Sequence, residues 1–162
     1  MEKILRTIKK YIPKALFSAL QPAYHFLLAG IGALRFGFPS RELYVVGVTG
    51  TKGKTSTAEL IAAILEEAGY AVALANTNRF KIESDSEKNL TKRSMLGRTL
   101  LQRFLRSAVD VKCEYAVIEM TSEGAKQFRH AFIDMDALIF TNLSPEHIES
   151  HGSWEKYVDA KV

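Results

Sequence analysis

The stretch VTGTKGKTST at residues 48–57 constrains the fold of this chain more than any other. It continues an apolar run at 43–49 that is typical of a buried strand, and it leads into an amphipathic segment at 54–69 that predicts a helix stopping at Gly69. Glycines 50 and 53 permit a tight turn between the two elements. A strand, glycine turn and helix in this order are typical of phosphate-binding loops, although Val48 stands where the common pattern has a glycine.

The rest of the chain continues this alternation of short apolar runs and amphipathic segments. We expect strands at 70–76, 114–120 and 137–143, helices at 95–109 and 153–161, and a loop or polar hairpin at 77–92. Strands that alternate with helices favour a parallel sheet, because each crossover needs a helix. The sequence therefore predicts an α/β fold with a mostly parallel, doubly wound sheet of P-loop type.

Charge divides the chain into two units, an N-terminal arm at 1–41 and a domain at 42–162. The net charge of +4 comes from the arm, which holds seven Lys and Arg against one Glu, whereas the domain has an excess of two acidic residues. A folded body without a basic excess does not favour a nucleic-acid partner. A single cysteine, Cys113, excludes an internal disulfide framework and a cysteine metal cluster, so a cytoplasmic setting is expected.

The arm combines basic residues with a run of twenty uncharged residues at 15–34. Its length would admit a transmembrane helix, but Pro22 interrupts it, and a span that kept the domain inside would place the N-terminal cations outside. We expect two short helices hinged near Pro22. They would lie on a partner or on a membrane surface, which would place the protein at the inner face of the membrane. The alternative is that the arm packs against its own domain.

The loop itself predicts a site for ATP with Mg²⁺. Its cofactor-binding candidates are Gly50, Thr51, Lys52, Gly53, Lys54, Thr55 and Ser56. Backbone N–H groups and the helix dipole attract the phosphates, Lys54 can reach the terminal phosphates, and the Thr55 hydroxyl can bind Mg²⁺. A GKT tripeptide alone would be weak evidence, but its place between strand and helix favours the functional interpretation.

The form TGTxGKT resembles the Mur ligase family, whose ATP-dependent enzymes add amino acids to the peptidoglycan precursor. The segments YAVIEMTSEGAKQFRH (115–130) and TNLSPEHIESHGSWEKYVDAK (141–161) are similar to two further stretches of that family's central domain. The most similar branch adds the third residue, diaminopimelate or lysine, to UDP-N-acetylmuramoyl-dipeptide. The similarity covers about residues 43–162.

This resemblance implies a peptide ligase that forms an acyl phosphate on a muramoyl-peptide carboxylate, which the amine of an amino acid then attacks. It implies that Lys54 and Lys161 act in catalysis, the latter as a carbamate, and that Glu119 and His147 bind a second Mg²⁺. Taken singly, Glu119, His147 and Lys161 are more typical of a strand-end carboxylate, a loop histidine and a helix-face lysine. Their order behind the loop favours the functional roles.

The chain also departs from the family's pattern. Glu123 stands where the ligases have His, KRSMLG at 92–97 does not match their Thr-Thr-Pro loop, and the arm occupies the place of their UDP-binding domain. Because the chain stops at Val162, we expect a fragment that does not ligate alone. Two alternatives stay open: a folylpolyglutamate synthetase-like ligase, disfavoured by Thr55, and a non-catalytic nucleotide-binding module tethered to a membrane or partner.

Overall fold

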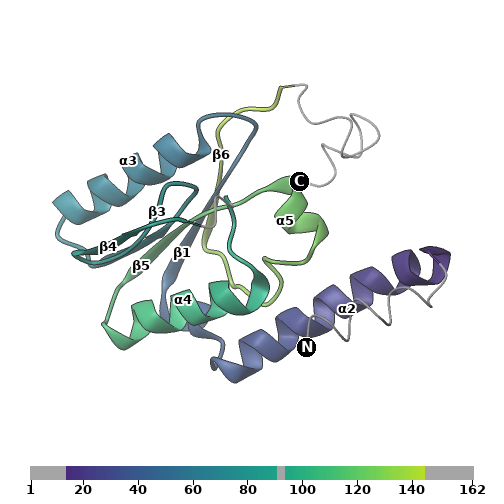
Figure 1. The fold of residues 1–162 in the computed structure, drawn as a ribbon. Helices are drawn as coiled ribbons and strands as arrows, with labels where there is room; N and C mark the ends of the chain where they lie inside the picture. The colour runs from purple at the N-terminus through teal and green to yellow at the C-terminus, as the bar shows by residue number, and fades with distance from the viewer. Residues whose placement is uncertain (1–13, 91–93, 145–162) are drawn as a thin grey trace.

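A computed structural model describes residues 14–90 and 94–144 (Figure 1). Its helices are α2 (Lys14–Arg35), η1 (Pro39–Glu42), α3 (Lys54–Glu67), α4 (Arg98–Asp110) and α5 (Ser122–Lys126). Its strands are β1 (Tyr44–Thr49), β2 (Val72–Ala75), β3 (Arg79–Ile82), β4 (Asp85–Lys88), β5 (Tyr115–Glu119) and β6 (Ala137–Phe140). The helix expected at 153–161 lies outside the described residues.

The strands form one sheet in the order β4-β3-β2-β5-β1-β6. Strands β2, β5, β1 and β6 run parallel, whereas β3 and β4 form an antiparallel hairpin at one edge. The mostly parallel α/β sheet is therefore confirmed, and the polar stretch after β2 is a hairpin. Parallel order brings the carboxyl ends of β2, β5, β1 and β6 to one side of the sheet, where ligands bind in such folds.

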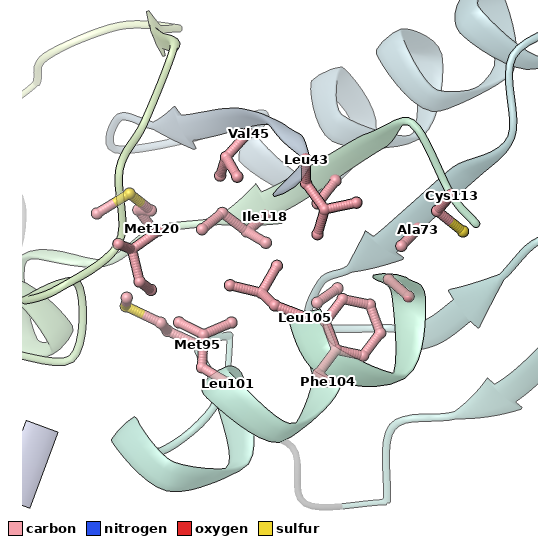
Figure 2. Packing of buried hydrophobic residues seen from close by; sticks show 14 residues of the cluster. Leu43, Val45, Ala73, Met95, Leu101, Phe104, Leu105, Cys113, Ile118 and Met120 are labelled. Atoms are coloured by element: carbon pink, nitrogen blue, oxygen red, sulfur yellow. The ribbon is translucent and has the colours of Figure 1, made fainter. Parts of the chain in front are cut away.

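Helices cover both faces of the sheet, with α3 on one side and α4 on the other (Figure 1). Strand β1 serves both faces: Val45 belongs to the core under α4, whereas Val46 and Val48 belong to the core under α3. Figure 2 shows Leu101, Phe104 and Leu105 of α4 against the sheet residues of the first core. Because Leu105 is fully buried, we estimate that its truncation to Ala costs about 2–5 kcal/mol.

In the part of the arm that the structure describes, one helix continues through Pro22, so the expected hinge there is wrong. Helix α2 runs from Lys14 to Arg35 with Pro22 inside it. Pro22 is exposed, so water can hydrogen-bond the carbonyl that a proline leaves without a partner. Within residues 14–90 and 94–144, no helix has both the length and the apolar content needed to cross a bilayer.

The second half of α2 packs against the body of the protein, as one of our two alternatives for the arm required. Ala29 and Ala33 are fully buried, and the Phe26 ring contacts the rings of Phe128 and Phe132 at centroid distances of 5.9 and 4.9 Å. Small residues on this face allow a close approach to α4. The outward face of α2 carries large apolar side chains that stay exposed.

Candidate functional site

The loop at residues 50–53 joins the end of β1 to the start of α3, and its two glycines are needed for different reasons. Gly50 has φ of 139°, and a Cβ atom there would collide with the Thr141 hydroxyl and the Asn142 backbone. Gly53 has φ of 80° and forms the N-cap of α3 in open space. Both values are costly for residues with a side chain. Gly50 therefore allows close backbone packing, and Gly53 allows the turn into the helix.

The exit from β6 braces the loop from one side. The Thr51 and Lys52 backbone N–H groups donate to the Asn142 carbonyl (2.9 Å) and Asn142 Oδ1 (3.0 Å), and Asn142 Nδ2 donates back to the Lys52 carbonyl (3.0 Å). The Thr141 hydroxyl also donates to the Lys52 carbonyl at 2.7 Å. These bonds fix the backbone conformation of the loop. They also direct two of the expected phosphate-binding amides toward Asn142.

The donors that remain for an anion lie in the first turn of α3. Helix α3 starts at Lys54 without a side-chain cap and without an acidic residue in its first turn. Among the described residues, the backbone N–H groups of Lys54, Thr55 and Ser56 have no hydrogen-bond acceptor. Unpaired amides at a helix start, together with the helix dipole, attract anions. This turn is therefore the most favourable position for a phosphate.

The Lys54 ammonium group lies over the loop. It donates to the carbonyls of Gly50 (3.0 Å) and Thr51 (2.9 Å) and is half-buried. Two neutral acceptors leave its charge without a carboxylate partner among the residues described. A cation held this way is available to a phosphate at the start of α3.

Glu119 is the buried charge of the site. It ends β5, is 2% exposed, and its Oε2 accepts hydrogen bonds from Thr55 Oγ1 (3.0 Å), Thr77 Oγ1 (2.8 Å) and the Thr77 backbone N–H (2.9 Å). Three donors from two other segments offset the cost of burying the carboxylate. Glu119 thus lies in direct contact with Thr55, the residue that follows Lys54.

Thr77 is a site residue that the sequence analysis missed. It follows β2 at the carboxyl edge of the sheet, beside the end of β5. The available signal was its position, a hydroxyl residue directly after a buried parallel strand. Its contact with Glu119 spans 42 residues of sequence, so no local pattern reveals it.

Several expected site residues are not brought together by the described structure. His147 and Lys161 lie outside the described residues. Within the described ranges, no three His, Cys, Asp or Glu side chains gather at metal-binding distance. The oxygen pair of Thr55 and Glu119 is of the kind that Mg²⁺ prefers, but it supplies only part of a ligand set.

Two basic residues near the site, Arg79 and Lys81, are held by carboxylates of α3. Arg79 Nη2 pairs with Glu59 Oε2 at 2.5 Å, and Lys81 Nζ pairs with Glu66 Oε2 at 2.6 Å. The hydrogen bond to Arg79 lowers the pKa of Glu59, against a smaller opposing effect of burial. These pairs tie the edge hairpin to α3. They do not point to an anionic ligand.

Comparison with known proteins identifies the domain. A family model described as the Mur ligase middle domain matches residues 48–162. A UDP-N-acetylmuramyl-tripeptide synthetase of Roseiflexus sp. (strain RS-1) is 38% identical over 138 residues, which are 84% of this chain and 27% of that protein. A UDP-N-acetylmuramoyl-L-alanyl-D-glutamate--2,6-diaminopimelate ligase of Syntrophomonas wolfei is 37% identical over 136 residues, or 83% of this chain and 27% of that protein.

Solved structures agree with this result. A UDP-N-acetylmuramoyl-L-alanyl-D-glutamate--2,6-diaminopimelate ligase matches with a TM-score of 0.65 and 32% identity, over 74% of this chain and 23% of that one. E. coli FolC, solved with DHPP and ADP, matches with a TM-score of 0.66 at 19% identity, over 82% of this chain and 37% of that one, and shows a shared fold. The chain spans about a quarter of the length of the curated relatives it matches.

Proposed function

Because this chain belongs to the Mur ligase family, we propose that it supplies the nucleotide-binding part of an ATP-dependent ligase that adds an amino acid to a muramoyl peptide. The observation that carries the proposal is the contact between Thr55 and Glu119 directly behind the glycine loop. It places a hydroxyl, a buried carboxylate and a helix start at one point on the carboxyl edge of the sheet. Nucleotide phosphates and their metal ion need such a point.

In the proposed reaction, an oxygen of the acceptor carboxylate attacks the γ-phosphorus of ATP and ADP leaves. The amine of the incoming amino acid then attacks the acyl carbon, an amide forms, and phosphate leaves. Several anions meet in these steps, so donors and cations must offset their repulsion. The phosphates would be bound at the start of α3. The donors there are the backbone amides of Lys54, Thr55 and Ser56 and the Lys54 ammonium group.

The residues present fit Mg²⁺, since Thr55 Oγ1 and the Glu119 carboxylate are hard oxygen donors 3.0 Å apart. Bound Mg²⁺ would neutralise developing charge on the phosphates. Thr77 would hold the Glu119 carboxylate in place through its hydroxyl and its backbone N–H. By resemblance, His147 would be a further metal ligand and Lys161, as a carbamate, would act in catalysis. Both remain proposals for the full-length protein.

The test of this function is an ADP-release assay on the full-length protein. Reactions would contain ATP and Mg²⁺ with a muramoyl dipeptide, with or without its UDP group, and with diaminopimelate or lysine. We expect sustained ADP release over many turnovers only when both an acceptor and an amino acid are present, because the amine is needed to clear the acyl phosphate. ATP binding by calorimetry with no acceptor-dependent ADP would favour the nucleotide-binding module instead.

We also propose that the arm makes peripheral contact with an anionic membrane. The outward face of α2 carries Leu20, Tyr24, Leu27, Ile31 and Leu34, spaced by three or four residues and 47% to 73% exposed. The arm has a charge of +6, and α2 contains no acidic residue. An apolar stripe flanked by cations is complementary to an anionic lipid surface, whereas a second copy would bring like charges together.

A further inference from the structure

Asn76 is a buried amide in the turn between β2 and β3, directly before the site residue Thr77. It follows the last residue of β2 and is 1% exposed. Its Oδ1 accepts from the backbone N–H groups of Asn78 (2.8 Å) and Arg79 (2.9 Å), and its own N–H donates to the Arg79 carbonyl at 3.1 Å. A buried amide needs such partners for its polar groups. The Asn76 side chain therefore fixes the backbone of the turn at residues 76–79.

The residue that follows β4 holds the same turn from the other side. Asn89 is buried, and its Nδ2 donates to the Asn76 carbonyl at 2.8 Å. Its backbone N–H donates to the Asn78 carbonyl, also at 2.8 Å. A buried polar network whose members are paired favours one arrangement over its alternatives. The turn is thus built to keep a single conformation.

The Asn76 side chain also connects the turn to helix α3. Its Nδ2 donates to Glu59 Oε1 at 2.8 Å, and Glu59 further accepts from Arg79 Nε at 3.0 Å and Nη2 at 2.5 Å. Glu59 follows Thr55 by four residues, so the two side chains lie one turn apart on the same face of α3. This face contacts Glu119 through Thr55 and contacts the turn through Glu59.

The turn in its fixed conformation presents Thr77 to Glu119. Thr77 donates to Glu119 Oε2 through its backbone N–H (2.9 Å) and through its hydroxyl (2.8 Å), and Thr55 donates to the same atom at 3.0 Å. Both donors of Thr77 reach one oxygen because the backbone beside Asn76 is held. The contact between Asn76 and Glu59 sets the position of the turn relative to α3, and hence of Thr77 relative to Thr55.

We propose that Asn76 is a positioning residue for the metal ligands: held by Glu59, it places Thr77 so that the Glu119 carboxylate is oriented beside Thr55. This inference rests on the proposed function, in which Thr55 and Glu119 bind Mg²⁺ together with ATP. Asn76 would act through Thr77 and Glu119, without a contact of its own to the nucleotide. Loss of its link to Glu59 should therefore weaken the binding of ATP with Mg²⁺ more than the binding of ATP alone.

A second ion pair between the hairpin and α3 provides a matched comparison. Lys81 Nζ contacts Glu66 Oε2 at 2.6 Å, two residues beyond Arg79 on β3 and seven residues beyond Glu59 on α3. In residues 14–90 and 94–144, neither of these two side chains bonds to the turn or to Glu119. A role limited to fastening the hairpin would respond to the loss of either pair. A role in placing the metal ligands would respond only to the loss of the pair at the turn.

The experiment exchanges a donor and an acceptor in the full-length protein. Asn76→Asp keeps the Oδ1 acceptor of the turn but sets a carboxylate against Glu59, which removes the link. Calorimetry should show about a tenfold loss of affinity for ATP with Mg²⁺ and less than about a twofold change in EDTA. Adding Glu59→Gln to Asn76→Asp restores one donor and one acceptor, so most of the lost affinity should return. Lys81→Gln, the matched control, should keep the wild-type ratio of the two affinities.

Two further measurements cover the other outcomes. Glu59→Ala removes the acceptor at a partly exposed helix position and should show the same Mg²⁺-dependent loss, which tests the link if Asn76→Asp does not fold. Amide exchange without nucleotide should be faster at Thr77 in Asn76→Asp and unchanged there in Lys81→Gln.

The outcomes separate this inference from the function on which it rests. Wild-type affinity in Asn76→Asp, no recovery in the double variant, or an equal loss in Lys81→Gln would overturn the positioning role. Absence of ATP binding by the wild-type protein would instead contradict the proposed function. Exchange at Thr77 would then decide the positioning role by itself, since an unchanged rate in Asn76→Asp would exclude it.

Discussion

The hydroxyl of Thr55 donates to Oε2 of Glu119 at 3.0 Å and so joins the start of α3 to the end of β5. Thr77 donates to the same oxygen from a third segment. In this arrangement, one carboxylate oxygen receives every described hydrogen bond that Glu119 makes through its side chain. The position of this oxygen therefore depends on two threonines, one foreseen from the loop motif and one not.

Thr77→Val should weaken binding of ATP with Mg²⁺ more than binding of ATP alone. The change removes one hydrogen bond to a buried carboxylate, worth about 1.5–3 kcal/mol, and leaves the backbone N–H in place. We expect about a tenfold loss of affinity in Mg²⁺ and little change in EDTA, measured by calorimetry. Ser86→Ala, on the exposed strand β4, is the control. Equal losses with and without Mg²⁺ would show that Thr77 supports the fold rather than the metal position.

Lys54→Ala should abolish detectable ATP binding while the protein stays folded. Within residues 14–90 and 94–144 the ammonium group makes only two hydrogen bonds, both to loop carbonyls, so its loss removes little from the core. A charge-assisted contact with phosphate of about 3 kcal/mol corresponds to roughly a hundredfold in Kd. Calorimetry gives the affinity, circular dichroism checks the fold, and Lys88→Ala serves as a matched control on β4. Unchanged affinity of Lys54→Ala for ATP would contradict the assignment of residues 50–56 as the phosphate-binding loop.

The outward stripe of α2 should determine binding to anionic vesicles. Leu27→Glu with Ile31→Glu puts two charges on exposed positions, and vesicle binding should fall more than about tenfold. Leu60→Glu with Ile64→Glu changes two similarly exposed apolar residues on α3 and should have no effect. Co-sedimentation with phosphatidylserine vesicles decides between them, and a chain starting at Arg41 should not pellet. Similar pelleting of both double variants would mean that the stripe faces something other than lipid.

Acidification should destabilise the protein partly through His130. Burial lowers the pKa of this histidine below its ordinary value of 6.5, so the folded state resists a proton that the unfolded state accepts. The resulting stability is complete above pH 6.5 and is lost as the pH falls from there toward the folded-state pKa. The slope is at most about 1.4 kcal/mol per pH unit for one proton. Urea unfolding from pH 7.5 to 5.0 should give a flatter profile for His130→Gln, and a parallel profile would contradict this.

Lys161 should act as a carbamate in the full-length enzyme. The proposal depends on the negative charge of the carbamate, so Lys161→Ala, which cannot form one, should lose most ligase activity. Added bicarbonate should raise the wild-type rate and leave the variant unchanged, whereas acetate should restore part of the variant's rate. Full turnover of Lys161→Ala in bicarbonate-free buffer would leave this lysine as an ordinary helix-face residue.

Local patterns predicted the parts of the structure that depend on neighbours in sequence. The strand, the two glycines and the helix around Lys54 lie within 27 residues, and their order alone indicates the loop. Thr77 was missed because its partner is 42 residues away. The predicted break at Pro22 rested on a local rule about proline. The packing of α2 depends instead on contacts such as Phe26 with Phe128, which join segments about a hundred residues apart. Long-range packing of this kind has no periodic signal.

The brace between the loop and Asn142 makes the nucleotide loop sensitive to a distant part of the chain. Thr51 and Lys52 hold their curve through the backbone and side chain of Asn142, and Ser144 N–H donates to Thr51 Oγ1 at 3.0 Å. In the sequence, His147 follows this segment as the third residue after Ser144. A displacement of the segment that follows β6 would therefore shift the backbone of the nucleotide loop. The affinity for the nucleotide would then depend on the position of the parts of the ligase that follow β6.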